Sequence, residues 1–178
     1  MTQDASARIP DGIAQHHMHH ASALGRHASP IALLLVTGLM IAATLGAFGS
    51  GRNHDFRAVA PAATLSVNTP ARIRNGMFFE TRIRIEPHQA FSDLILAVEP
   101  SLWRDVTVNT MIPAPAEETF EQGAFRLSYG EWEAGAPLEI KIDSQINPSL
   151  FRGTEGTIAL YDGDERVLAL PIEMRVLP

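Results

Sequence analysis

The chain has 178 residues, no cysteine, and 20 Asp and Glu residues against 14 Lys and Arg, which gives a net charge of −6. The acidic balance argues against binding to nucleic acid or to anionic lipid, because both need a basic surface. The lack of cysteine excludes disulfides and thiolate metal sites within the chain.

Residues 1–30 form a polar segment rich in His, Ala and Ser, without hydrophobic periodicity, and we expect them to be disordered. Within this tail, His16, His17, His19 and His20 surround Met18. Neutral imidazoles bind Zn, Cu and Ni, and a thioether favours Cu(I), so the cluster is a candidate transition-metal site. The alternative is a compositionally biased tail without a ligand, and the sequence favours that alternative.

Ile31 to Gly49 carries no charged side chain. As a helix it would be roughly 28 Å long, close to the ~30 Å hydrocarbon core of a bilayer, and it would satisfy its own backbone hydrogen bonds. Ala47 and Gly49 also form a small-x-small pattern, so cleavage as a signal peptide is an alternative. The length of the apolar stretch and its late start favour an uncleaved transmembrane helix.

The orientation of this span follows less directly from charge. Arg8 and Arg26 precede it and Arg52 and Arg57 follow it, so the positive-inside rule gives nearly a tie. One early span before one compact domain is typical of a signal anchor with an exported domain. We therefore expect a single-pass protein of the inner (plasma) membrane, with an extracytoplasmic C-terminal domain.

The remainder of the chain divides into a linker and a strand-rich domain. Ser50 to Ala63 is rich in small residues and lacks a regular pattern, as linkers do. From Thr64 to Pro178, short runs alternate apolar with polar residues and are separated by turn signals such as Asp162-Gly163. About seven or eight such runs predict an all-β, antiparallel β-sandwich over residues 64–178.

The alternation also predicts which side chains face the interior of the sandwich. Leu94–Val98 is apolar on both faces, which indicates a central strand. The residues expected in the core are Ile83, Ile85, Leu96, Val108, Ile140, Ile142, Ile158, Leu160 and Met174.

In strand order, length and single N-terminal anchor, the segment from Thr64 to Val176 resembles the immunoglobulin-like domains that many bacteria display outside the inner membrane. The resemblance implies the architecture alone. The Cys…Trp…Cys spacing of true immunoglobulin domains is absent, and neither Trp103 nor Trp132 substitutes for it. No catalytic or binding residue is therefore carried over from that class.

Four arginines form a candidate anion site. Arg82 and Arg84, with Arg72 and Arg74 upstream, could grip phosphate or carboxylate with their guanidinium groups. Each of the first two has a Glu two residues away on the same strand face. Ion pairing on a wet sheet face is the favoured role.

Two acidic segments, a loop expected over residues 113–122 and the turn at 162–165, could hold Ca²⁺, but neither has the spaced ligands of a dedicated calcium loop. The sequence also contains no nucleophile elbow, phosphate-binding Gly loop or HExxH helix. His88 is the only His from Thr64 onward. We therefore expect no enzymatic activity and no cofactor.

Three aromatic residues are the candidate contacts with a partner: Trp103, Tyr129 and Trp132, with Trp132 and the neighbouring Tyr129 expected to contribute most. Aromatic side chains on loops anchor protein interfaces more often than other types do. The alternative is that each Trp caps an open end of the sandwich. The sequence favours a cap for Trp103 and leaves the choice even for Trp132, which stands between two Glu residues.

Together these features predict a membrane-anchored, extracytoplasmic protein-interaction module that acts as an accessory or assembly subunit of a membrane complex. Its expected partners are the lipid bilayer, through Ile31 to Gly49, and a membrane protein, with no nucleic acid. The alternative is a transition-metal-handling membrane protein that uses the His-rich tail.

Overall fold

The computed structural model describes residues 23–48, 52–150 and 152–178, which belong to two compact units. The N-terminal unit contains α1 (Ala23–Thr44). This helix begins within the tail that the sequence analysis expected to be disordered, so that expectation is corrected from Ala23 onward. Gly49, the expected end of the apolar helix, lies outside the described residues. In the described part of the chain, no helix is both long and apolar enough to cross a membrane.

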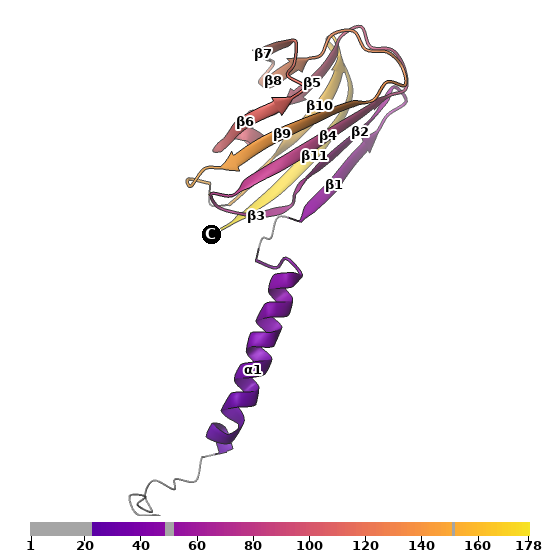
Figure 1. Ribbon diagram of the computed structural model, residues 1–178. Coiled ribbons are helices and arrows are strands. Elements are labelled where there is room, and N and C mark those ends of the chain that lie inside the picture. The colour runs from indigo at the N-terminus through magenta and orange to yellow at the C-terminus, as the bar shows by residue number, and fades with distance from the viewer. Residues whose placement is uncertain (1–22, 49–51, 151) are drawn as a thin grey trace, which may run out of the picture. The chain divides into compact units, whose positions relative to one another are not determined.

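The second unit consists of two β-sheets, as the sequence predicts (Figure 1). One sheet has five strands in the order β1-β2-β4-β9-β6, and the other has six in the order β3-β11-β10-β5-β8-β7. The strands of the five-stranded sheet are β1 (Asn53–Val59), β2 (Ala63–Pro70), β4 (Phe78–Pro87), β9 (Leu138–Ile146) and β6 (Val106–Ile112). Those of the six-stranded sheet are β3 (Arg72–Arg74), β11 (Glu165–Leu177), β10 (Thr154–Asp162), β5 (Leu94–Val98), β8 (Ala124–Ser128) and β7 (Glu117–Glu121).

Neighbouring strands run antiparallel in both sheets, except that β3 pairs with the end of β11 in parallel. A short helix, α2 (Pro100–Trp103), connects β5 to β6 and so carries the chain from one sheet to the other. The all-β sandwich is therefore confirmed, and the parallel pair is a local departure from the antiparallel prediction.

The central strands of the five-stranded sheet show why the alternating pattern predicts their faces. Ile83 on β4 lies opposite Ile140 on β9, and both side chains are fully buried. The residues between the buried positions, such as Arg82 and Lys141, are also cross-strand partners and point to solvent. A side-chain period of two thus separates the apolar inner face from the charged outer face.

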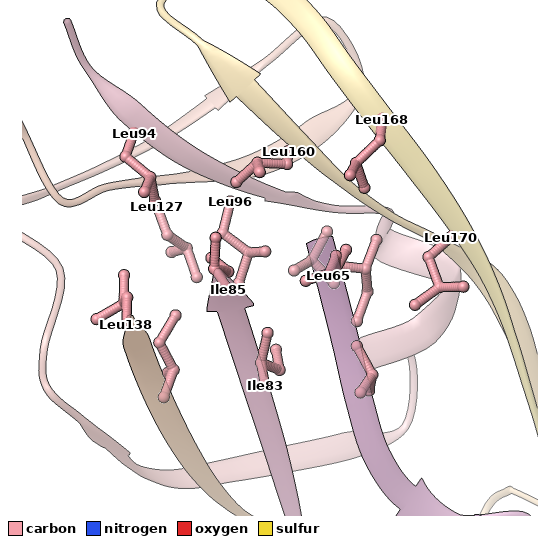
Figure 2. Close-up of a cluster of buried hydrophobic side chains, with 14 of the residues drawn as sticks. Leu65, Ile83, Ile85, Leu94, Leu96, Leu127, Leu138, Leu160, Leu168 and Leu170 are labelled. Atoms are coloured by element: carbon pink, nitrogen blue, oxygen red, sulfur yellow. The ribbon is translucent and has the colours of Figure 1, made fainter. Parts of the chain in front are cut away.

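The core lies between the two sheets and is built from Leu, Ile and Val side chains of both (Figure 2). A smaller cluster of buried residues consists of Ile73, Ile146, Leu150, Met174 and Val176. All the predicted core residues are buried except Val108, which is 36% exposed. That prediction is wrong because β6 is an edge strand whose pairing with β9 is irregular between Val108 and Thr110.

The linker expected from residue 50 to 63 also needs correction. Asn53–Val59 forms β1, which pairs along its whole length with β2 at the edge of the five-stranded sheet. Phe56 and Ala58 of β1, and Ala60 just after it, contact the core, whereas the other side chains of β1 are exposed. An edge strand with so few inward apolar residues carries little periodic signal, which is why the sequence pattern did not predict it.

Candidate functional site

The edge strand β6 of one sheet and the edge hairpin β7–β8 of the other lie on the same side of the sandwich (Figure 1). Four aromatic residues belong to this region. Trp103, the last residue of α2, has its ring 5.3 Å from that of Phe125 on β8. Phe125 in turn lies 5.1 Å from Phe120 on β7, in an edge-to-face arrangement. Tyr129 follows β8, and its hydroxyl donates to the Sδ of Met111 on β6 at 3.6 Å. We call these four aromatic residues the aromatic edge.

Phe120 is the exposed member of the aromatic edge, with 60% of its surface accessible. It is held opposite Phe125 by the tight β7–β8 turn, in which Gln122 and Gly123 both have positive φ values, 53° and 77°. Such a turn needs residues that tolerate the left-handed region. The hairpin therefore presents a large apolar ring to solvent from a fixed backbone position.

The neighbouring edge strand β6 is unusual because none of its residues is charged. Val108 and Ile112 are exposed, the latter by 63%. Edge strands present unpaired backbone N–H and C=O groups, and natural proteins commonly protect them with charges, bulges or short length. The pairing irregularity near Val108 is the one such device on β6. The Tyr129–Met111 contact joins the aromatic edge to this uncharged strand, and we treat the two as one candidate contact surface.

Tyr129 joins the two sheets at this surface. Its hydroxyl lies 3.5 Å from the carbonyl oxygen of Pro113, in addition to the Met111 contact. Burial, with a smaller contribution from the negative charge of Glu118, raises the pKa of Tyr129 to about 12. The phenol is therefore neutral at physiological pH and acts as an apolar ring with one hydrogen-bonding atom.

The outer face of β7 is acidic. Glu117 and Glu121, together with Asp93 and Asp164 from two nearby loops, line a hollow of about 290 Å³. We call this feature the acidic hollow. It lies on the opposite face of β7 from Phe120, because the positions of Glu117 and Glu121 differ from that of Phe120 by an odd number, three and one.

One cation, Arg126, lies at the acidic hollow and is 6% exposed. Its Nη2 donates to the carbonyl oxygen of Gly163 at 2.6 Å. The guanidinium carbon also lies 4.7 Å above the ring centroid of Tyr161. These contacts tie Arg126 to the β10–β11 turn, so its charge is held in place by the protein itself.

Trp132 lies apart from the aromatic edge, in the segment between β8 and β9. Its backbone pairs with that of Phe91, and its Nε1 donates to the carbonyl oxygen of Ala136 at 2.8 Å. The side chain is half-buried against the main core, although Glu131 and Glu133 are exposed. The structure therefore brings Trp103 and Tyr129 to the aromatic edge and places Trp132 apart from it. All three side chains are partly buried against the main core, so partner contact at each of them stays a prediction.

The arginines behave as the sequence analysis favoured. Arg82 pairs with Glu80, and the Nε of Arg84 lies 2.9 Å from the Glu86 carboxylate. Hydrogen bonding to Arg84 lowers the pKa of Glu86. Arg72 and Arg74 lie on β3 in the other sheet, so the four guanidinium groups do not form one site.

The acidic turn after β10 is also accounted for structurally. Asp162 accepts hydrogen bonds from the Ser92 hydroxyl and from the backbone N–H groups of Ser92 and Asp93, at 2.7, 2.8 and 3.1 Å. These bonds, with that of the Ser92 hydroxyl the largest, lower the pKa of Asp162. Across the residues that the structure describes, no three His, Cys, Asp or Glu side chains meet in a metal-binding arrangement.

The remaining candidate residues from the sequence are His88 and the histidines of the N-terminal tail. The Nε2 of His88 is 3.3 Å from the Thr64 hydroxyl, and its Nδ1 is 3.2 Å from the Pro61 carbonyl oxygen. A cavity of about 40 Å³ between the sheets, next to Trp103, has room for little more than water. The candidate metal ligands His16, His17, His19 and His20 lie outside the described residues.

The sequence pattern does not indicate Phe120 and Phe125 as site residues, and it predicts a loop over residues 113–122. Glu117–Glu121 is instead β7, paired with β8 in register. The available signal was the Gln122-Gly123 pair between two short runs, which is a hairpin pattern. The three Glu residues of β7 obscured it, because they removed the expected apolar alternation.

Comparisons with known proteins add the following. No family model and no curated protein matches the sequence. Solved structures similar to the chain include ChBD2 from Thermococcus kodakarensis KOD1, at 13% identity and a TM-score of 0.37, covering 68% of this chain and 97% of that one. CaCohA2 from Clostridium acetobutylicum is similar at 10% identity and a TM-score of 0.42, and the match covers 60% of this chain and 86% of that one. The alkylpurine DNA glycosylase AlkC from Pseudomonas fluorescens is similar at 15% identity and a TM-score of 0.31. The match covers 61% of this chain and 28% of that one.

Proposed function

We propose that this chain is a membrane-anchored protein-interaction module with an immunoglobulin-like sandwich, acting outside the cytoplasm as an accessory or assembly subunit of a membrane complex. The observation that carries the interaction role is the surface formed by β6 and the aromatic edge. It combines an exposed aromatic ring, Phe120, with an edge strand that bears no charge. Aromatic side chains are enriched in protein interfaces, and charged ones are depleted at their centres.

The anchor is proposed from the segment Ile31 to Gly49, whose residues carry no charge. Its described large apolar side chains are exposed on all sides of the helix, with Leu33, Leu34 and Leu35 between 68% and 73% accessible. A helix that exposes apolar side chains all around is costly in water and suits a lipid environment. Two Arg residues flank the segment on each side, so charge does not decide its orientation. The proposal that the N-terminus lies in the cytoplasm therefore rests on the order of one early span and one following domain, which is typical of signal anchors.

The interaction role can be tested by photo-crosslinking in native membranes. A photoreactive amino acid at Phe120 should yield one dominant crosslinked membrane protein. The same amino acid at Lys141, which is exposed on the outer face of the five-stranded sheet, is the matched control and should yield none. The same crosslinks from both positions, or none from Phe120, would contradict a docking role for the aromatic edge.

A further inference from the structure

We infer that β7 is the site at which a basic, extended segment of a partner protein adds to the six-stranded sheet as one more strand. The inference rests on the proposed interaction role and deepens it by naming the partner's chemistry. β7 ends the sheet and, among the strands that the structure describes, pairs with β8 alone. Its far side therefore has unpaired backbone N–H and C=O groups, which an incoming strand can satisfy.

The two faces of β7 specify different side chains in such a strand. Glu117, Thr119 and Glu121 lie opposite Ser128, Arg126 and Ala124, and they face the acidic hollow. Phe120 lies on the other face, beside Phe125, and shares that face with Glu118, which lies opposite Leu127. Because side chains alternate along a strand, an added strand would direct every second residue toward the hollow and the others toward Phe120.

Charge identifies the residues that suit the acidic hollow. Four carboxylates, from Asp93, Glu117, Glu121 and Asp164, line it. The single cation there, Arg126, is already bonded to the Gly163 carbonyl and stacked over a tyrosine ring. The hollow thus has excess negative charge and enough volume for a Lys or Arg head group. The partner segment accordingly alternates basic residues with apolar ones.

A second copy of the chain is the less suitable occupant. Two β7 edges would bring like charges together, which opposes pairing. The oppositely charged edge, β3, contributes only Arg72–Arg74, and the Nε of Arg74 already donates to the Phe48 carbonyl at 2.8 Å. A three-residue strand offers little backbone for a stable interface.

The test uses the full chain in a nonionic detergent and a fluorescent eight-residue peptide of alternating Lys and Val. Binding is measured by fluorescence anisotropy. The E117K/E121K double variant should weaken binding at least about tenfold, as loss of attraction followed by repulsion predicts. The E117Q/E121Q pair should give a smaller loss in the same direction. E131K/E133K changes the net charge equally at exposed sites beside Trp132, and its affinity should stay within about twofold of the wild type.

A second peptide separates strand addition from simple charge attraction. It has the same side chains but is N-methylated at every residue, so that it cannot donate backbone hydrogen bonds along either edge. Strand addition predicts that it binds at least about tenfold more weakly and no longer protects β7 amides from hydrogen exchange. Equal binding by the two peptides, or equal loss in E117K/E121K and E131K/E133K, would overturn the inference.

The remaining outcomes are also decisive. Self-association of the chain that is lost in R72E would replace the basic segment with a second copy and overturn the inference. Crosslinking from Phe120 without peptide binding would overturn strand addition while leaving the proposed interaction role intact. Peptide binding without any crosslink from Phe120 would contradict the proposed interaction role in the membrane. It would leave the inference that β7 accepts a basic strand intact.

Discussion

The side chain of Trp132 packs against the main core while both of its sequence neighbours are exposed. Its truncation in W132A removes core contacts and the hydrogen bond to the Ala136 carbonyl. Because the side chain is only half-buried, we expect a loss of about 2–4 kcal/mol in the free energy of unfolding, at or below the range for buried Trp. Urea unfolding followed by circular dichroism measures this loss. W132F should recover most of the stability, and an unchanged midpoint in W132A would indicate a contact role instead of a cap.

Asp162 makes the stability of the fold depend on pH in the acidic range. Its lowered pKa in the folded state means that the carboxylate contributes stability above its ordinary value of 3.8, and that this contribution is lost as pH falls toward the folded value. D162N should therefore be less stable than the wild type at pH 7, and the difference should shrink below about pH 4. Urea unfolding at pH 7 and pH 3 compares the two proteins. A difference that is independent of pH would contradict the role of the ionised carboxylate.

The raised pKa of Tyr129, about 12, predicts how the stability of the fold changes at alkaline pH. The folded state favours the neutral phenol, so its contribution to stability is complete below about pH 10 and is lost as pH rises toward 12. The chain has two tyrosines, so absorbance titration of a Y161F variant follows Tyr129 alone. We expect tyrosinate to appear near pH 12, or together with unfolding. Titration near pH 10 in the folded protein would contradict the burial of Tyr129.

At the scale of elements, the paired strands β4 and β9 form the centre of the five-stranded sheet. Ile83 and Ile140 are cross-strand neighbours and fully buried. I83A and I140A should each cost about 2–5 kcal/mol, because a cavity adds to the lost transfer free energy. The double variant should cost less than the sum, since both substitutions enlarge one cavity. Strict additivity would show that the two side chains do not share their packing environment.

Elements with a strong periodic pattern were predictable, and elements at sheet edges were not. Phe79–Ile85 and Leu138–Ile142 alternate cleanly, and the structure places them in β4 and β9. The edge strands β1 and β7 bury few side chains, so their sequences lack the signal. Strand order was not predictable either, because alternation defines faces and not neighbours. The candidate site lies mostly on such edges, which is why the sequence indicated Trp103 and Tyr129 but not Phe120.

At the scale of the whole molecule, the proposed anchor makes a prediction about partition between membrane and solution. L39R places a guanidinium near the centre of Ile31–Gly49, which should cost roughly 2.5–3.5 kcal/mol on insertion scales and deplete the membrane fraction. Fractionation followed by immunoblotting measures this, with L39F as the apolar control. Full-length wild-type protein in the soluble fraction without detergent would contradict the anchor, and a mature chain beginning near Ser50 would indicate cleavage.

The position of β11 has a consequence for biosynthesis. β11 is translated after every other strand of the two sheets that the structure describes, yet it lies between β3 and β10. A nascent chain that stops short of β11 leaves β10 unpaired on one side and β3 without its neighbour. It also lacks Leu168, Leu170 and Ile172, which belong to the core. The six-stranded sheet can therefore close only after its last-made strand has emerged, and the growing polypeptide exposes aggregation-prone surface until then.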